Sequence, residues 1–200
     1  MEGNISMAKL YFKYGAMGSS KTAQALITKF NYEERGMKVW LAKPAIDVRD
    51  GDLWIKSRIG LAEKAYAIRE DENVYEYFKQ ISHAPFDVII IDECQFLTPE
   101  QVDQLGQIVI DFDIPVLCFG LRTDFRTEMF PGSRRLFEIA ESISEIKTIC
   151  ECGRKASVNA RIDANGNIIT EGEQVFLGGN DSYTAMCYKC YLEKSKNKMK

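Results

Sequence analysis

The sequence predicts an α/β fold built on a mainly parallel sheet, followed by a small lobe with a different secondary-structure pattern. Two continuous apolar runs, 88–91 and 116–119, have the composition of parallel strands that are covered on both faces. Between these runs, residues 98–101 supply an N-cap threonine, a proline at the first helical position and a glutamine, which predict a helix to about Asp111. Alternating strands and helices favour a doubly wound sheet with right-handed crossovers.

The N-terminal part of the chain follows the same alternation. Residues 10–14 form a short β-rich run that ends at Gly15, and residues 21–35 have a mostly helical apolar pattern. Residues 39–42 predict a second strand. The polar stretch 43–60 has no clear period, and we expect it to be a loop with functional potential.

From Cys150 onward the alternation of strands and helices gives way to short β-like segments, which predicts a second, small lobe. Short β-like pieces at 157–162 and 168–170 flank residues 163–167, whose Asn-Gly pair is a strong hairpin signal. The lysine-rich end, 194–200, has the composition of a frayed tail.

Length and charge exclude several classes of protein. A chain of 200 residues can bury one core plus a small appended lobe, but not two full nucleotide-binding domains. A net charge of -3 disfavours a nucleic-acid partner held through its backbone. No stretch approaches the roughly 18 apolar residues of a membrane span, and residues 1–9 lack the apolar core of a secretory signal, so we expect a cytoplasmic protein without a membrane partner.

Residues 15–22 match the phosphate-binding pattern G-x-x-x-x-G-K-[ST], except that Ser20 replaces the second glycine. In such a P-loop, backbone N–H groups and the following helix N-terminus bind phosphate, the lysine contacts the β- and γ-phosphates, and the threonine hydroxyl binds magnesium. A chance glycine-serine turn is disfavoured by the strand before it and the helix after it. The predicted ATP-binding residues are Gly15, Ala16, Met17, Gly18, Ser19, Ser20, Lys21 and Thr22.

Two adjacent carboxylates, Asp92 and Glu93, end the apolar strand 88–91. We expect Asp92 to hold magnesium through water and Glu93 to accept a proton from an attacking hydroxyl. The sequence Asp-Glu-Cys-Gln also resembles the Asp-Glu motif of nucleic-acid helicases. A P-loop ATPase or a nucleic-acid motor fragment is therefore the rival interpretation. The chain length argues against a motor because a helicase needs two such domains.

Four cysteines predict a structural zinc site. They form two close pairs with 34 residues between the pairs, a pattern suited to tetrahedral four-sulfur coordination. With four thiolates no coordination position remains open, so the metal has no catalytic role. The ligands are Cys150, Cys152, Cys187 and Cys190, whereas Cys94 and Cys118 fit ordinary buried cysteines. The fold class is therefore a P-loop, doubly wound, mainly parallel α/β domain with a small C-terminal zinc-binding lobe.

With the P-loop, Asp-Glu-x-Gln-Phe and the zinc lobe in this order, the chain resembles the thymidine kinases of the bacterial and vertebrate cytosolic type over residues 7–193. The resemblance includes the segments 43–49, 120–126 and 171–180, together with Tyr183. We therefore expect a nucleotide-binding domain over 7–148, a zinc lobe with a nucleoside lid over 149–193, and flexible ends at 1–6 and 194–200.

The resemblance implies transfer of the γ-phosphate of Mg-ATP to the 5′-hydroxyl of thymidine, with Glu93 as the general base and a homotetrameric assembly. Deoxyuridine is the closest competing acceptor. Phe125 is expected to stack on the thymine ring. On the phosphate and magnesium side the implied residues are Asp47, Arg49, Asp92, Glu93, Cys94 and Gln95, and around the nucleoside they are Phe125, Gln174, Val175, Phe176, Leu177, Gly178 and Tyr183.

Overall fold

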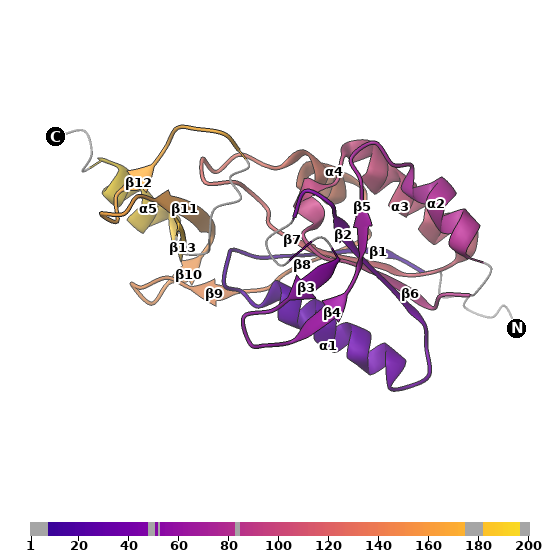
Figure 1. The fold of residues 1–200 in the computed structure, drawn as a ribbon. Coiled ribbons are helices and arrows are strands. Elements are labelled where there is room, and N and C mark those ends of the chain that lie inside the picture. Colours follow the sequence, from indigo (N-terminus) through magenta and orange to yellow (C-terminus); the bar gives the residue numbers. More distant parts are fainter. Residues whose placement is uncertain (1–7, 48–50, 52, 83–84, 175–181, 197–200) are drawn as a thin grey trace, which may run out of the picture.

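The computed structural model describes residues 8–47, 51, 53–82, 85–174 and 182–196. Six strands form one sheet in the order β5-β2-β6-β7-β1-β8, and every neighbouring pair in it is parallel (Figure 1). The predicted α/β class is confirmed, and the two apolar runs form its two central strands. The strands are β1 (Leu10–Tyr14), β2 (Val39–Pro44), β5 (Tyr66–Ile68), β6 (Val88–Ile91), β7 (Val116–Gly120) and β8 (Ser142–Glu145).

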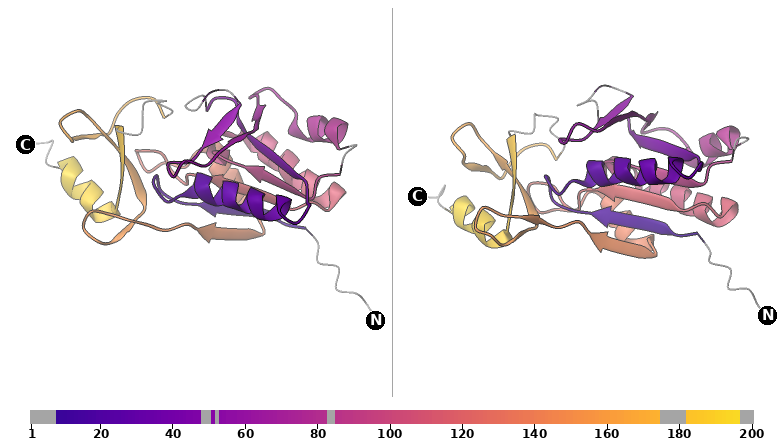
Figure 2. Two further views of the ribbon diagram at one scale, coloured as in Figure 1. Left: turned by 60° about the horizontal axis from the view of Figure 1, so that its bottom comes forward. Right: turned by 90° about the horizontal axis from the view of Figure 1, so that it is seen from below.

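Helices cover both faces of this sheet. Helix α1 (Lys21–Glu33) lies on one face, and α2 (Val74–Ile81), α3 (Pro99–Phe112) and α4 (Pro131–Ile139) lie on the other (Figures 1 and 2). Successive side chains of a strand point to opposite faces. In β6, Ile89 and Ile91 therefore pack in the core under α2–α4, whereas Val88 and Ile90 pack against α1. This two-sided burial explains why the strand is apolar throughout.

The predicted start of α3 is confirmed. The Thr98 hydroxyl accepts a hydrogen bond from Gln101 N at 3.2 Å, and Gln101 Oε1 accepts one from Thr98 N at 3.2 Å. This capping box satisfies two of the backbone donors that a helix N-terminus leaves free. The helix ends at Asp113, which adopts a left-handed conformation.

The prediction of a loop over 43–60 was wrong where strands occur, since β2 extends to Pro44. Strand β3 (Trp54–Lys56) also lies within this range and pairs antiparallel with β4 (Ala62–Lys64). Only Ile55 of β3 is buried, in the core shared with α1, so a three-residue strand shows no readable alternation. The hairpin lies on the α1 face of the sheet (Figure 2).

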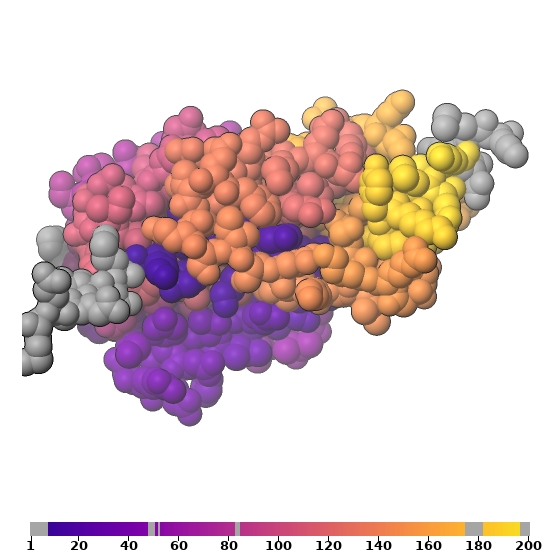
Figure 3. Space-filling model, turned by 180° about the vertical axis from the view of Figure 1, so that it is seen from behind, coloured from indigo at the N-terminus to yellow at the C-terminus, as the bar shows by residue number. Residues whose placement is uncertain are grey.

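The C-terminal residues form separate small sheets. Strand β9 (Thr148–Ile149) pairs with β10 (Lys155–Ala156), and β11 (Val158–Ile162) lies between β12 (Ile168–Ile169) and β13 (Tyr183–Met186). The predicted hairpin is confirmed, since β11 and β12 are antiparallel and Gly166 has φ +79°. Helix α5 (Tyr188–Lys196) continues three residues past the expected end of the lobe. The lobe forms one end of the molecule (Figures 1 and 3).

This lobe has a hydrophobic core of its own, in which Val158, Ala160, Ile168, Met186 and Tyr191 are buried.

Among the described residues, no helix combines the length and the hydropathy that a bilayer crossing requires.

Ser20, the residue before α1, carries backbone strain. It has φ +64° and ψ 26°, and its side chain makes no capping hydrogen bond. A left-handed conformation costs an L-residue roughly 1–2 kcal/mol, whereas glycine adopts it freely. We expect Ser20→Gly to raise the free energy of unfolding in urea by about 0.5–1 kcal/mol, after allowing for the larger chain entropy of glycine.

Ser82→Gly is the control for this substitution, because Ser82 has φ -71° and gains nothing from glycine. If Ser20→Gly were no more stable than the unmodified chain, the strain at Ser20 would be refuted.

Candidate active site

The candidate site lies at the carboxyl edge of the sheet, where β7 separates β1 from β6. Gly120, the last residue of β7, accepts a hydrogen bond from Gly15 N at 3.2 Å. A Cβ atom at Gly120 would lie 2.6 Å from both Cys94 Sγ and Gln95 Oε1. Glycine at this position therefore allows the P-loop after β1 and the acidic segment after β6 to approach the same strand end.

The predicted P-loop residues 15–22 form one closed turn. Ala16 O accepts hydrogen bonds from Ser19 N at 3.2 Å and from Lys21 Nζ at 3.0 Å. Gly18 and Ser20 both have positive φ, so Ser20 keeps the backbone conformation that a glycine would adopt at this position. The departure from the motif therefore leaves the loop conformation intact and adds strain.

Asp92 lies beside the P-loop and is only 3% exposed. Burial raises the pKa of this carboxyl above its usual range and the neighbouring Glu93 raises it further, while hydrogen bonds from the Thr22 side chain and the Glu93 backbone and the charge of Lys21 lower it. Within the described part of the chain, Asp92 Oδ1 is buried without a hydrogen-bond partner. A buried carboxylate oxygen next to a threonine hydroxyl is an oxygen donor set that fits Mg²⁺.

Glu93 has φ +52° and ψ 35°, immediately before a short 3₁₀ turn (Cys94–Phe96). Gln95 Nε2 donates a hydrogen bond to Glu93 Oε2 at 2.5 Å, and Gln95 Oε1 accepts one from Leu121 N at 2.9 Å. Gln95 is 1% exposed, so it orients the Glu93 carboxylate from a fixed position at the end of β7. Left-handed non-glycine residues concentrate at functional sites, which supports a role for Glu93.

Cys94 lies in the core beneath this turn. Its side chain is fully buried, and burial raises the pKa of the thiol well above its usual range.

Asp47 follows β2 at the same sheet edge and is 5% exposed. Arg49 lies outside the described residues, as do Val175, Phe176, Leu177 and Gly178 of the expected lid.

Two of the expected nucleoside-side residues, Phe125 and Tyr183, contact Arg161, which sequence reasoning missed. The Arg161 guanidinium carbon lies 3.8 Å from the centroid of the Phe125 ring, and Arg161 Nη2 donates a hydrogen bond to the Tyr183 hydroxyl at 2.7 Å. Gln174 Nε2 donates to Asp124 Oδ2 at 3.1 Å. Phe125 is 1% exposed, so Arg161 covers one face of the ring proposed to stack on thymine.

A cavity of about 440 Å³ lies beside Gln95. Pockets of a few hundred Å³ are suited to small-molecule ligands. Phe96 and Phe130 form an edge-to-face pair in its wall, with ring centroids 5.6 Å apart. Sequence reasoning did not select either ring, although Phe96 directly follows the acidic motif. Further lining residues are Pro44, Leu97, Pro131 and Gln174.

Asn159 was also missed, and it links three segments. Its Oδ1 accepts a hydrogen bond from Met17 N of the P-loop at 2.7 Å, and its Nδ2 donates one to Thr123 O at 2.9 Å. The side chain is 3% exposed. An amide between buried apolar residues of β11 was the available sequence signal, since a buried polar group requires partners.

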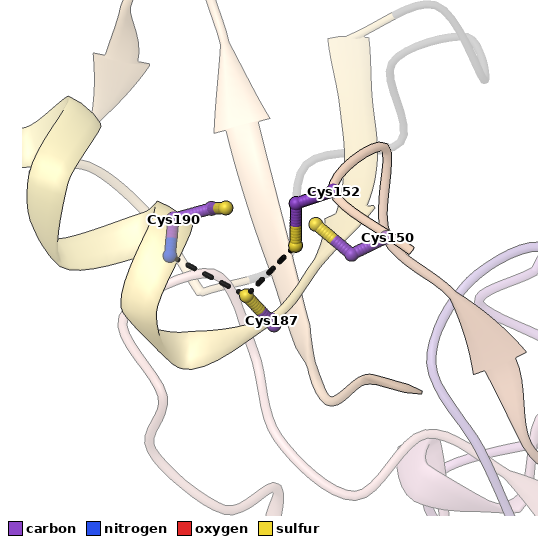
Figure 4. A group of neighbouring side chains, drawn as sticks. All are labelled: Cys150, Cys152, Cys187 and Cys190. Atoms are coloured by element: carbon purple, nitrogen blue, oxygen red, sulfur yellow. Dashed lines mark hydrogen bonds between the residues drawn. The ribbon is translucent and has the colours of Figure 1, made fainter. Parts of the chain in front are cut away.

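The four predicted zinc ligands come together in the C-terminal lobe (Figure 4). Their sulfur atoms all lie within 4.8 Å of one another, and Cys152 Sγ and Cys187 Sγ are 3.6 Å apart. A Zn–S distance of about 2.3 Å in a tetrahedron requires sulfurs roughly 3.8 Å apart. Hydrogen bonds with Cys187 and Cys152 raise the pKa of Cys190 to about 12, whereas backbone hydrogen bonds lower the pKa of Cys150 to about 6 and also lower that of Cys187. The donor set therefore fits a cation such as Zn²⁺.

Comparisons with known proteins agree with this geometry. A thymidine kinase of Legionella pneumophila (strain Lens) is 52% identical over 183 residues, covering 90% of this chain and 88% of the relative. A thymidine kinase of Vibrio cholerae serotype O1 is 47% identical, covering 94% and 98%, and one of Ruegeria pomeroyi is 45% identical, covering 94% and 95%. A solved DNA replication initiation factor has a TM-score of 0.40 at 15% identity over 70% of this chain and 40% of its own, which is too slight to inform function.

A family model described as Thymidine kinase matches residues 8–191, which is nearly the whole described chain. The chain belongs to the thymidine kinase family.

Proposed function

We propose that this chain transfers the γ-phosphate of Mg-ATP to the 5′-hydroxyl of thymidine, giving dTMP and ADP, with Glu93 as the general base. The observation that carries the proposal is the meeting of a P-loop and a strand-end carboxylate pair at one sheet edge, in a chain of this family. A P-loop ATPase or motor fragment is not favoured.

On the ATP side, we assign phosphate binding to the backbone N–H groups of the P-loop and to Lys21. Gly15 N, Met17 N and Ser19 N are already engaged within the protein, so we assign phosphate binding to the other backbone N–H groups of the turn. Thr22 and Asp92 would hold Mg²⁺, which when bound neutralises charge on the transferring phosphate. Asp47 and Arg49 belong to this side of the proposal.

On the acceptor side, Glu93 accepts the proton of the 5′-hydroxyl as the new O–P bond forms. The hydrogen bond from Gln95 keeps the Glu93 carboxylate turned toward the end of β7. The cavity beside Gln95 and the aromatic rings around it are the proposed nucleoside site. Gln174, Tyr183 and the residues 175–178 complete a lid, which favours transfer to the nucleoside over hydrolysis by excluding water.

The four cysteines hold Zn²⁺ in a structural role in this proposal. Ile168, Met186 and Tyr191 belong to a lobe core that is small, so metal binding supplies much of the lobe's stability. A homotetramer, implied by family resemblance, is also part of the proposal.

The function is tested by measuring ADP release from Mg-ATP with thymidine, deoxyuridine, deoxycytidine, single-stranded DNA or no acceptor. We expect release that depends on thymidine and that yields dTMP. Release without an acceptor, or release stimulated by DNA, would instead support a P-loop ATPase.

Glu93→Gln should lower turnover by about 10²- to 10⁴-fold, the range for a positioned base, while ATP binding is largely retained. Steady-state kinetics and ATP titration measure the two quantities separately. Glu128→Gln is the matched control, because the Glu128 side chain is 65% exposed. Unchanged turnover in Glu93→Gln would remove Glu93 from its assigned role.

Cys187→Ser should lose zinc and weaken thymidine binding more than ATP binding, because the lid begins in the lobe that the metal stabilises. Metal analysis and the two KM values measure this. Cys118→Ala is the control, since Cys118 lies in β7 and away from the cysteine cluster. A Cys187→Ser variant with full zinc content and full activity would refute the link between metal and lid.

A further inference from the structure

Lys43 is a completely buried lysine near the carboxyl edge of the sheet, where the candidate active site lies. It lies near the end of β2 and is 0% exposed. Its neighbours in the strand pack on opposite faces, Ala42 in the core under α2–α4 and Leu41 in the core shared with α1 and Ile55. By the same alternation, Lys43 points to the α1 face, where the β3–β4 hairpin packs.

The ammonium group of Lys43 uses all of its donors on backbone carbonyls. Nζ donates to Asp47 O at 2.6 Å, to Trp54 O at 2.8 Å and to Gly51 O at 3.0 Å. Asp47 Oδ2 lies 4.0 Å away and compensates the buried charge. Because an ammonium has three N–H groups, none is left for a phosphate, so Lys43 is not a second phosphate-binding lysine.

A buried ammonium is costly, and an apolar side chain of similar length would fill the same space without that cost. What the ammonium adds is a fixed arrangement of three backbone carbonyls, two that precede β3 and one at its first residue, Trp54. The position is adjacent to the acidic pair: Asp92 N donates to Ala42 O at 3.0 Å, one residue before Lys43.

We propose that Lys43 is a positioning residue for the Mg-ATP side of the site. By holding Asp47 O, Gly51 O and Trp54 O, it sets where the Asp47 carboxylate lies relative to Asp92. This inference rests on the proposed function, in which Asp47 belongs to the magnesium side.

The test compares Lys43→Met with Lys56→Met, an exposed lysine on β3 of the same hairpin. We expect Lys43→Met to raise the KM for Mg-ATP about tenfold, as for loss of hydrogen bonds to a charged group, and to leave the KM for thymidine within about twofold. Zinc content should be unchanged. Lys56→Met should alter none of these values.

A second readout needs no substrate. Trp54 is 38% exposed and Trp40 is 6% exposed, so acrylamide quenching of tryptophan fluorescence reports chiefly on Trp54. Quenching should increase in Lys43→Met because Trp54 O loses its partner. This readout separates the inference from the proposed function, since it stands whether or not thymidine is the acceptor.

Two results would overturn the inference. One is a KM for Mg-ATP and a quenching constant that both remain at the values of the unmodified chain. The other is an equal loss of affinity for both substrates with loss of zinc, which would indicate general unfolding rather than positioning.

Discussion

The close approach of the P-loop and the acidic segment to Gly120 is the constraint on which the candidate active site depends. The P-loop donates a backbone hydrogen bond to Gly120 O, and the Gln95 amide occupies the space that a side chain at Gly120 would fill. One residue without a Cβ thus lets the P-loop and the acidic segment after β6 share the end of β7. Gln95 then bridges the strand end and Glu93, so the orientation of the proposed base follows from backbone packing.

Strain and buried charge gather at this edge, and the core of the fold offsets them. Ser20 and Glu93 both adopt left-handed conformations, at a cost of order 1–3 kcal/mol each. Asp92 and Lys43 are buried polar or charged groups. The sheet beneath them is apolar on both faces, and such burial is the dominant favourable term in folding. Asn159 of the C-terminal lobe also hydrogen-bonds Met17 N and Thr123 O, so its side chain links the lobe to the P-loop and to the segment after β7.

Local sequence signals predicted the elements and motifs that are encoded by neighbouring residues. The capping box of α3, the strands β6 and β7, the P-loop turn and the four clustered cysteines each depend on a short run or a spacing. The acidic pair was assigned from its position at the end of an apolar strand, and the family resemblance supplied the nucleoside-side assignments.

The residues missed act through contacts between segments distant in sequence. Asn159 contacts Met17, which is 142 positions away. Arg161 contacts Tyr183 because β11 and β13 pair, and it also packs on Phe125 in the segment after β7. No local pattern encodes such meetings. Strand β3 was missed for a different reason, since a three-residue strand with one buried side chain has no measurable period.

The most direct test of this account is the turnover number of Gly120→Ala, compared with Gly106→Ala. Gly106 lies in α3, where a Cβ would make an ordinary 3.5 Å contact with Ile139, so alanine should be tolerated or slightly stabilising. We expect Gly120→Ala to fold and to bind zinc but to lose roughly a hundredfold in turnover, because Gln95 and Glu93 are displaced. A folded Gly120→Ala protein with the turnover of Gly106→Ala would contradict the account.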